Sequence, residues 1–228
     1  IVNIPKNTQT IALQRYFPLI ESQKLNISYQ KYLTDFLTTK YLFNVTHLNS
    51  YLRCPFCFYH QTILRIPAVK DKFSSLGTAV HVALSDLYSH QPNTITNLIS
   101  IFTKSLIKEG LNKSDYNESL FRGTNILTDY FAQYGNNLCK KVIVDKDFKS
   151  ANLHLNNIPI TGKIDLIEYL DGNKINVIDF KTGNPDGKHQ ELSPDGDYFR
   201  QLAFYKLLIS LDSSFSQTFN SGIIDFVQ

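Results

Sequence analysis

The chain has 228 residues, of which 43% are hydrophobic and 19% are charged, and its formal net charge is +3. A chain of this length forms one large domain or two small ones, and its composition excludes disordered, collagen-like and coiled-coil proteins. The small net charge neither indicates nor excludes a nucleic-acid partner.

The first half of the chain has the apolar spacing of helices, with residues recurring three and four positions apart. Asn44 or Thr46 is expected to cap one of these helices, and Pro55 to punctuate it. The predicted helices are Ile11–Ile20, Tyr29–Leu42, His47–Tyr59, one that opens at Gly77 and Thr78, Thr94–Ile107 and Ser119–Tyr134.

The second half alternates apolar and polar residues, which is typical of strands. Asp171-Gly172-Asn173 predicts a hairpin turn, and residues 183–197 predict a long loop. The predicted elements are strands at Lys141–Phe148, Ile158–Tyr169 and Lys174–Lys181, a helix at Tyr198–Leu211 and a last strand at Ser221–Val227. This order favours an α/β or α+β domain with a helical N-terminal portion.

The sequence also bears on where the protein resides. No apolar run reaches the roughly 18 to 20 residues of a membrane-spanning helix, and Ile1–Ile20 lacks the pattern of a signal peptide. We therefore expect a soluble, cytoplasmic protein with no membrane partner. The chain begins with Ile1 and contains no Met, from which we expect a piece of a longer polypeptide.

Three cysteines, Cys54, Cys57 and Cys139, form an odd set that favours a reducing compartment over a disulfide scaffold. Cys54-Pro55-Phe56-Cys57 has the spacing of zinc and iron–sulfur sites, but a structural zinc needs four ligands. His60 and Cys139 are the candidates to complete such a set. The aromatic flanks favour a core position for these cysteines instead.

Two acidic residues occupy unusual places in predicted strands. Asp179 and Lys181 share one face of a strand that is apolar on both sides, and Asp165 lies in the neighbouring strand. Such a carboxylate needs a counter-charge, a metal or a solvent-filled cleft. If the hairpin register places Asp165 and Asp179 level, their repulsion favours a hard cation such as Mg²⁺.

From spacing alone, Asp179 and Lys181 fit a salt bridge at the sheet's rim equally well. A cation beside a metal-binding carboxylate can also orient a water and neutralise charge on a phosphoryl group. The basic residues Arg53, Arg65, Lys70 and Lys72 likewise fit either a DNA-backbone contact or a solvated helix face.

The run Gly162-Lys163-Ile164-Asp165, followed after thirteen residues by Asp179-Phe180-Lys181-Thr182-Gly183, resembles the active-site signature of the PD-(D/E)xK nuclease superfamily in its RecB-like branch. Three further segments resemble motifs of that branch in the same order. They are the entry helix at Ser50–Tyr59, the Gly-x-x-x-His motif at Gly77–His81 and the Gln-x-x-x-Tyr helix at Gln201–Tyr205. The resemblance spans roughly Thr46 to Leu211.

The resemblance implies a restriction-endonuclease-like α/β core, with a mixed central sheet flanked by helices. It implies that His81, Asp165 and Asp179 hold Mg²⁺ or Mn²⁺, with the backbone carbonyl of Phe180 as a further ligand. Iron–sulfur members of the branch carry four cysteines, but no Cys follows Cys139, so no iron–sulfur cluster is expected.

The same resemblance assigns roles around the metal. Lys181 would activate or position the attacking water, while Gln201 and Tyr205 would line the cleft and contact DNA or support Lys181. Where the family often has Glu on its first core strand, this chain has Asp145, whose role stays open. Before the motif is considered, His81 and Tyr205 fit ordinary core positions.

The implied function is a metal-dependent DNA nuclease that cuts single- or double-stranded DNA beside a helicase motor, as in UvrD- or AddAB-type helicases. Residues 46–228 would form the nuclease domain and residues 1–45 a helical extension packed on it. One alternative is a catalytically silent module that grips DNA or braces a helicase. Another is a zinc-binding protein–protein module built on Cys54 and Cys57.

Overall fold

The computed structural model describes residues 27–67, 70–90, 94–135, 138 and 141–227, so the helix predicted at Ile11–Ile20 and the position of Cys139 lie outside the described residues. The chain forms two compact units, Ile1–Tyr41 and Leu42–Gln228. In the first unit, helix α2 spans Ile27–Thr39, and the ring of Tyr32 stacks on that of Phe36.

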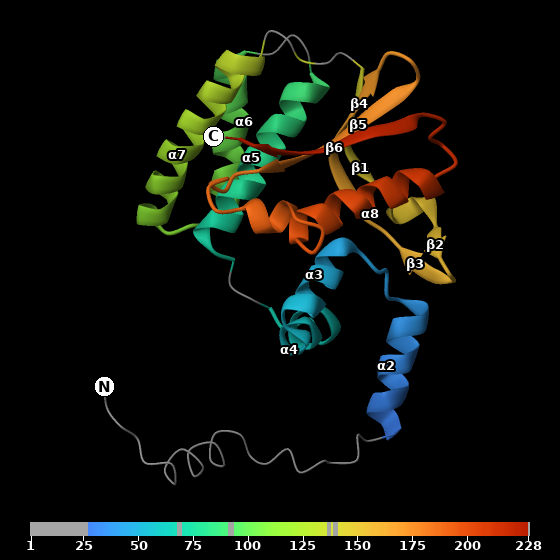
Figure 1. Ribbon diagram of the computed structural model, residues 1–228. Helices are drawn as coiled ribbons and strands as arrows, with labels where there is room; N and C mark the ends of the chain where they lie inside the picture. Colours follow the sequence, from blue (N-terminus) through green and yellow to red (C-terminus); the bar gives the residue numbers. More distant parts are fainter. Residues whose placement is uncertain (1–26, 68–69, 91–93, 136–137, 139–140, 228) are drawn as a thin grey trace, which may run out of the picture. The chain divides into compact units, whose positions relative to one another are not determined.

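The second unit carries most of the predicted helices (Figure 1). They are α3 (Val45–Arg53), α4 (Pro55–Phe58), the π-helix η1 (Tyr59–Ile63), α5 (Lys72–Ser89), α6 (Ile95–Lys108), α7 (Lys113–Tyr134) and α8 (Asp197–Leu211), with short 3₁₀ turns at Lys149–Ala151 and His189–Leu192. Among the residues described, no helix is both long and apolar enough to cross a bilayer.

Side-chain caps explain where several helices begin. Asn44 caps α3, as predicted, by accepting a hydrogen bond from the His47 N–H. The prediction that a helix opens at Gly77 is wrong, because Asp71 accepts the Ser74 N–H and starts α5 at Lys72. Asn112 likewise caps α7 earlier than predicted.

The helix predicted at His47–Tyr59 is in fact two helices and a π-helix. Cys54 has extended backbone angles between α3 and α4, and Pro55 supplies no N–H to continue α3. The thiol of Cys54 then caps α4 by accepting the N–H of Cys57 at 3.1 Å.

The central sheet has the order β1-β4-β5-β6, with β1 at Val142–Asp147, β4 at Lys163–Leu170, β5 at Lys174–Lys181 and β6 at Thr218–Phe226. The first three strands are antiparallel, whereas β6 pairs parallel to β5 because α8 crosses between them. The predicted hairpin is confirmed, with Gly172 and Asn173 both at positive φ.

The strand predicted at Ile158–Tyr169 is broken at Thr161 and Gly162. The Thr161 N–H bonds to the carbonyl of Phe43, and the Gly162 carbonyl accepts the N–H of Phe148. A Cβ at Gly162 would lie 2.7 Å from Leu208 Cδ1 of α8, so any larger residue would displace the buried Leu208 side chain. The first piece becomes β3 (Ile158–Ile160), which pairs with β2 (Leu153–Leu155) in a hairpin that the pattern missed.

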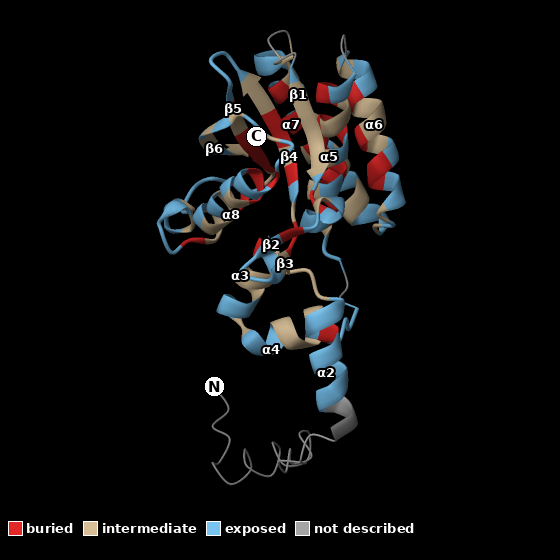
Figure 2. Ribbon diagram, turned by 90° about the vertical axis from the view of Figure 1, so that its right-hand side faces the viewer, coloured by how far each residue is buried: buried red, intermediate tan, exposed pale blue. Residues whose placement is uncertain are grey.

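Helices cover both faces of the sheet, as Figures 1 and 2 show. Helices α5, α6 and α7 pack on one face around Leu166, Ile178 and Phe180. Helix α8 packs on the other, around Ile175 and Val177. The predicted α/β fold, with a mixed central sheet flanked by helices, is confirmed, and alternate residues of β5 enter opposite cores.

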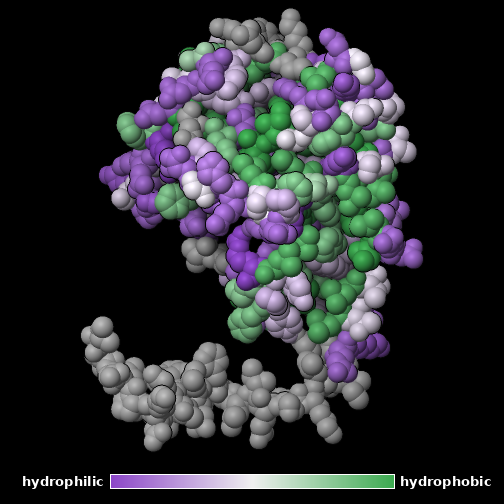
Figure 3. All heavy atoms as spheres, viewed as in Figure 1, coloured by the Kyte–Doolittle hydropathy of each residue, from purple (hydrophilic) through white to green (hydrophobic). Residues whose placement is uncertain are grey.

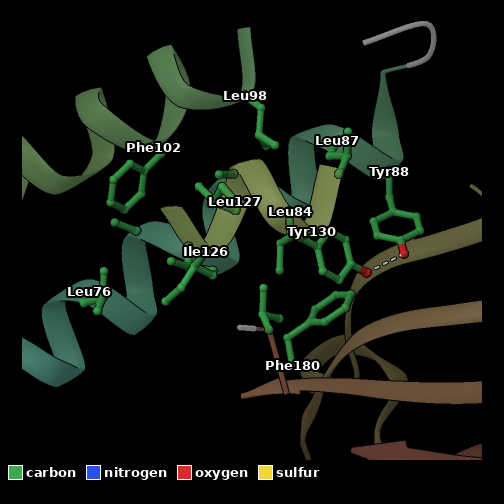
Figure 4. Close-up of a cluster of buried hydrophobic side chains, with 14 of the residues drawn as sticks. Leu76, Leu84, Leu87, Tyr88, Leu98, Phe102, Ile126, Leu127, Tyr130 and Phe180 are labelled. Atoms are coloured by element: carbon green, nitrogen blue, oxygen red, sulfur yellow. Dashed lines mark hydrogen bonds between the residues drawn. The ribbon is translucent and has the colours of Figure 1, made fainter. Parts of the chain in front are cut away.

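Figure 4 shows the core beneath α5 and α7, where the ring of Phe180 lies below that of Tyr130. The hydroxyls of Tyr88 and Tyr130 hydrogen-bond to each other at 2.8 Å, which satisfies both buried groups. This core anchors the far face of β5 at the residue between Asp179 and Lys181.

Gly123→Ala is expected to destabilise this core. A Cβ at Gly123 would lie 2.1 Å from Cζ of the buried Phe102, so the ring must move. We expect the free energy of unfolding to fall by about 1–3 kcal/mol in urea denaturation. Combined with Phe102→Leu, the same substitution should cost less, and an equal cost in both backgrounds would contradict the clash.

Candidate active site

The predicted site residues converge where β4 and β5 approach α5 and α8. Asp179 and Lys181 end β5, Asp165 lies near the start of β4, and His81 lies within α5. Gln201 and Tyr205 follow one another at i and i+4 on α8. The Cα partners of β4 and β5 end at Leu166 and Ile178, and Asp165 and Asp179 are the next residues of the two strands.

Asp179 is the most enclosed carboxylate of the group, with 2% of its surface exposed. Its Oδ1 accepts hydrogen bonds from Gln201 Nε2 at 2.7 Å and from the Tyr205 hydroxyl at 2.8 Å. Its buried Oδ2 lies 2.6 Å from Lys181 Nζ but receives no hydrogen bond of good geometry from the described residues. One carboxylate oxygen is therefore held rigidly, while the other has only a charge beside it.

Lys181 links this carboxylate to α8. Its ammonium donates to Gln201 Oε1 at 3.1 Å and lies 5.3 Å from the centre of the Tyr198 ring. The side chain remains 24% exposed, so the ammonium reaches the surface of the site. Gln201 therefore contacts Lys181 directly, while its role in the site remains a prediction.

The two carboxylate oxygens of Asp165 contact two different elements, α5 and β5. Its Oδ1 lies 3.3 Å from His81 Nδ1, and its Oδ2 accepts the backbone N–H of Phe180 at 2.9 Å. The Phe180 N–H thus bonds to a side chain of β4 just beyond the last Cα partners of the two strands. This bond fixes Asp165 beside the end of β5.

The electrostatics of the two carboxylates differ. Burial raises the pKa of Asp179, and the charges of Lys181 and the hydrogen bonds offset only part of this rise. Burial acts the same way on Asp165, but the hydrogen bond from His81 outweighs it and lowers the pKa of Asp165. Burial lowers the pKa of His81, yet the bond and charge of Asp165 raise it overall, as expected for an ion pair.

Two hollows open on either side of Lys181. One, of about 700 Å³, is lined by α5 residues including His81 and by Asp145 and Lys163. The other, of about 530 Å³, lies between α3, α4 and the start of α8 and includes Gln201 and Tyr198. Figure 3 shows hydrophilic side chains where α8 begins. An extended ligand can therefore reach the ammonium from both sides.

Some residues at the site were missed by sequence reasoning. Tyr198 precedes Gln201 by one turn of α8, and this helical spacing is a signal that could have found it. Asn49 and Asp197 carried no such signal, because their contact joins α3 to α8 across 148 positions. Arg200 strengthens this junction by donating to Asn49 Oδ1 at 2.8 Å.

Asp145, whose role stayed open, lies on the rim of the first hollow. It pairs with Lys163 Nζ at 2.7 Å and accepts a hydrogen bond from the Ser85 hydroxyl at 2.6 Å. Its backbone has φ of 54°, an uncommon conformation for Asp in a strand. These contacts tie β1 to α5 and β4 beside the site.

Three of the basic residues singled out in the sequence, Arg53, Lys70 and Lys72, form ion pairs within the fold. Arg53 pairs with Asp197, Lys70 pairs with Glu109, and Lys72 pairs with Glu118 at 2.7 Å. These pairs favour the solvated-face interpretation of that stretch over a dedicated DNA-backbone track.

The donor set suits a hard divalent cation by its chemistry, since it combines two carboxylates, an imidazole and a buried carboxylate oxygen without a hydrogen bond. In the arrangement present, His81 and Lys181 engage these carboxylates instead. Within the described ranges, no three His, Cys, Asp or Glu side chains are grouped as metal ligands. The assignment of His81, Asp165, Asp179 and the Phe180 carbonyl as ligands therefore remains a prediction.

A family model described as the PD-(D/E)XK nuclease superfamily matches residues 42–223, which include every candidate site residue. The chain belongs to the PD-(D/E)XK nuclease superfamily. PD-(D/E)XK proteins generally are metal-dependent nucleases that hydrolyse phosphodiester bonds. A comparison with curated proteins finds no match.

The PD-(D/E)XK fold explains why these residues meet in this chain. Asp179 and Lys181 lie at the end of β5, and helices cover both faces of this strand. Asp165 comes from the neighbouring strand, whose tight turn keeps the two carboxylates in register. The residues that meet at this edge of the sheet all lie within the matched range.

Tyr205→Phe tests the contact between α8 and Asp179. It removes a hydrogen bond to a buried carboxylate, so we expect the free energy of unfolding to fall by about 1.5–3 kcal/mol. Urea denaturation measures this loss. Tyr134→Phe is the matched control and should change little, because Tyr134 is 40% exposed and its hydroxyl accepts an exposed hydrogen bond from Gln133. Equal stabilities for the two variants would contradict the assigned bond.

Proposed function

We propose that this chain is a divalent-metal-dependent deoxyribonuclease domain that hydrolyses phosphodiester bonds in DNA. The single observation that carries the proposal is the cluster of Asp179, Lys181, Gln201 and Tyr205, linked to one another by hydrogen bonds and charge. Within it, Lys181 lines both hollows and Gln201 lines one. A structural salt bridge needs no such network, because an exposed partner alone would satisfy the lysine.

His81, Asp165 and Asp179 would hold Mg²⁺ or Mn²⁺, with the Phe180 carbonyl as a further ligand. When bound, such an ion supplies Lewis-acid stabilisation and lowers the pKa of a water. The chain's own residues do the positioning. Gln201 and Tyr205 hold Oδ1 of Asp179 in one orientation.

Lys181 supplies the positive charge of the protein at the reacting centre. Its ammonium is held by Gln201 and reaches the surface between the hollows, where it can orient a water and neutralise charge growing on a phosphoryl oxygen. Because Gln201 binds both Lys181 and Asp179, it fixes the distance between the cation and the carboxylate.

The order of the sequence motifs supports a more specific proposal about the branch of the superfamily, the domain bounds and the partner. The entry helix, the Gly-x-x-x-His segment and the Gln-x-x-x-Tyr helix support membership of the RecB-like branch, with residues 46–228 as the nuclease domain and 1–45 as an extension. A helicase motor, in the same polypeptide or in a complex, is the proposed partner, and DNA repair or recombination the proposed setting. These motifs are present in α3 and α4, α5 and α8.

Cleavage of labelled single- and double-stranded DNA by the chain, with Mg²⁺, with Mn²⁺ and with a chelator, tests the function. We expect products only with a divalent ion, and equal activity from Asp147→Asn, an exposed acidic residue at the end of β1 that serves as a matched control. DNA binding without cleavage under every ion would favour the silent DNA-gripping module instead.

A further inference from the structure

Two thiols lie beside the site and have no part in the proposed chemistry. Cys54 and Cys57 are both free, with Cys57 exposed and Cys54 partly exposed. They stand at the junction between α3 and α4, which the break at Pro55 creates. Both are therefore open to a small reagent from solvent.

The geometry couples the two thiols directly. Cys54 Sγ accepts the backbone N–H of Cys57 at 3.1 Å. The neighbouring Cys57 side chain lowers the pKa of Cys54, and the Cys54 side chain raises the pKa of Cys57. Cα atoms three residues apart in a helical turn lie about 5 Å apart, within the range that a disulfide spans.

The pair also shares a surface with the proposed reacting centre. Cys54 and Cys57 line the hollow of about 530 Å³ that Lys181 and Gln201 line from the opposite elements. The neighbouring Arg53 forms an ion pair with Asp197, the first residue of α8. A change at the α3–α4 junction therefore acts on a wall of the cleft and on the helix that carries Gln201.

We propose that Cys54 and Cys57 form a reversible dithiol–disulfide site whose oxidation, by a low-molecular-weight disulfide such as oxidised glutathione, weakens DNA binding at the Lys181 cleft. The thiolate of Cys54 attacks the small disulfide, forming a mixed disulfide and releasing one thiolate. Cys57 then loses its proton and attacks Cys54 Sγ, forming the protein disulfide and releasing the second thiolate. Two protein thiols are oxidised and one small disulfide is reduced to two thiols.

The consequence for DNA rests on the proposed function, but the disulfide itself does not. The disulfide links the two side chains covalently, which restrains the α3–α4 junction beside Arg53 and its ion pair with Asp197. It also removes the thiol groups from the hollow's wall. Reduction restores both, so the effect is reversible.

The first measurement is thiol state by mass spectrometry. The chain carrying Cys139→Ser is equilibrated with set ratios of reduced and oxidised glutathione and then alkylated. We expect Cys54 and Cys57 to become resistant to alkylation together. The mass of the protein should fall by two hydrogen atoms, and no glutathione adduct should remain. Adding Cys57→Ser should instead leave a stable adduct on Cys54. Thiols that stay reactive under oxidised glutathione would overturn the proposal, as would zinc bound stoichiometrically through the pair.

The second measurement is DNA affinity by fluorescence anisotropy in chelator, before and after oxidation. We expect the oxidised protein to bind at least about fivefold more weakly, and dithiothreitol to restore binding. Cys54→Ser should bind equally in both conditions. Equal affinity of the two redox states would overturn the control of DNA binding. If neither state binds DNA, the proposed function fails, while the labelling result still decides the dithiol site.

Discussion

Lys181→Met is expected to lower DNA cleavage by about 10²–10³-fold in single-turnover assays, because it removes the protein's positive charge from the reacting centre. Methionine keeps much of the side chain's volume, so packing against the Tyr198 ring is largely retained. Asp179 loses its counter-charge but keeps its hydrogen bonds from Gln201 and Tyr205, and therefore its position.

Lys163→Met is the matched control for this experiment. Lys163 lines the first hollow and pairs with Asp145, but it makes no contact with Asp179. We expect weaker DNA binding from the lost charge and an unchanged rate at saturating DNA. A similar loss of rate in both lysine variants would show that Lys181 contributes only general charge, and would remove its assigned role.

Asp179→Asn is expected to abolish calorimetric Mn²⁺ binding and to lower cleavage by about 10³-fold or more, since a hard cation needs the carboxylate charge and supplies several kcal/mol of transition-state stabilisation. Folding should survive the change. Asn keeps the shape of Asp, and Gln201 and Tyr205 can still hold its side chain in place.

With the metal removed by a chelator, the stability of Asp179→Asn relative to the wild type should depend on pH. Burial raises the pKa of Asp179, so its protonated form favours the folded state. The wild type has this contribution in full below the unfolded pKa and loses it as the pH rises through the folded pKa. Asp179→Asn cannot ionise, so its stability relative to the wild type should increase over that rise, as measured by urea denaturation.

Asp212→Asn provides the opposite case. Burial raises the pKa of Asp212, but hydrogen bonds from Ser214 and the charge of Lys146 outweigh it and lower the pKa overall. Its carboxylate therefore stabilises the fold above the unfolded pKa and loses this effect as the pH falls. We expect Asp212→Asn to be less stable than the wild type at neutral pH, with cleavage intact. As the pH rises, the stability relative to the wild type should increase for Asp179→Asn and decrease for Asp212→Asn. The same trend in both variants would contradict the electrostatic account.

The long, periodic elements could be predicted from sequence because their signals are local. Thr94 caps α6 through the Asn97 N–H, and Gly172 with Asn173 makes the turn between β4 and β5. The predicted start of a helix was wrong where the capping residue precedes the apolar pattern by several positions. Asp71, which caps α5, is such a residue. The β2–β3 hairpin was missed because its strands have three residues each and offer too little alternation.

For the candidate site as well, part could be predicted from local sequence patterns and part could not. The sequence by itself determined which candidate residues share a face. Asp179 and Lys181 do so by the two-residue period of a strand, and Gln201 and Tyr205 by the four-residue spacing of a helix. All four residues lie within the range 42–223 that the family model matches.

Only the tertiary structure decided how these residues engage one another. The bond from Tyr205 to Asp179 spans 26 positions, and that between Asn49 and Arg200 spans 151. Such contacts depend on the angle at which α8 crosses the sheet and on the closeness allowed at Gly162. Packing sets both, because shape complementarity between distant segments leaves no periodic trace along the chain.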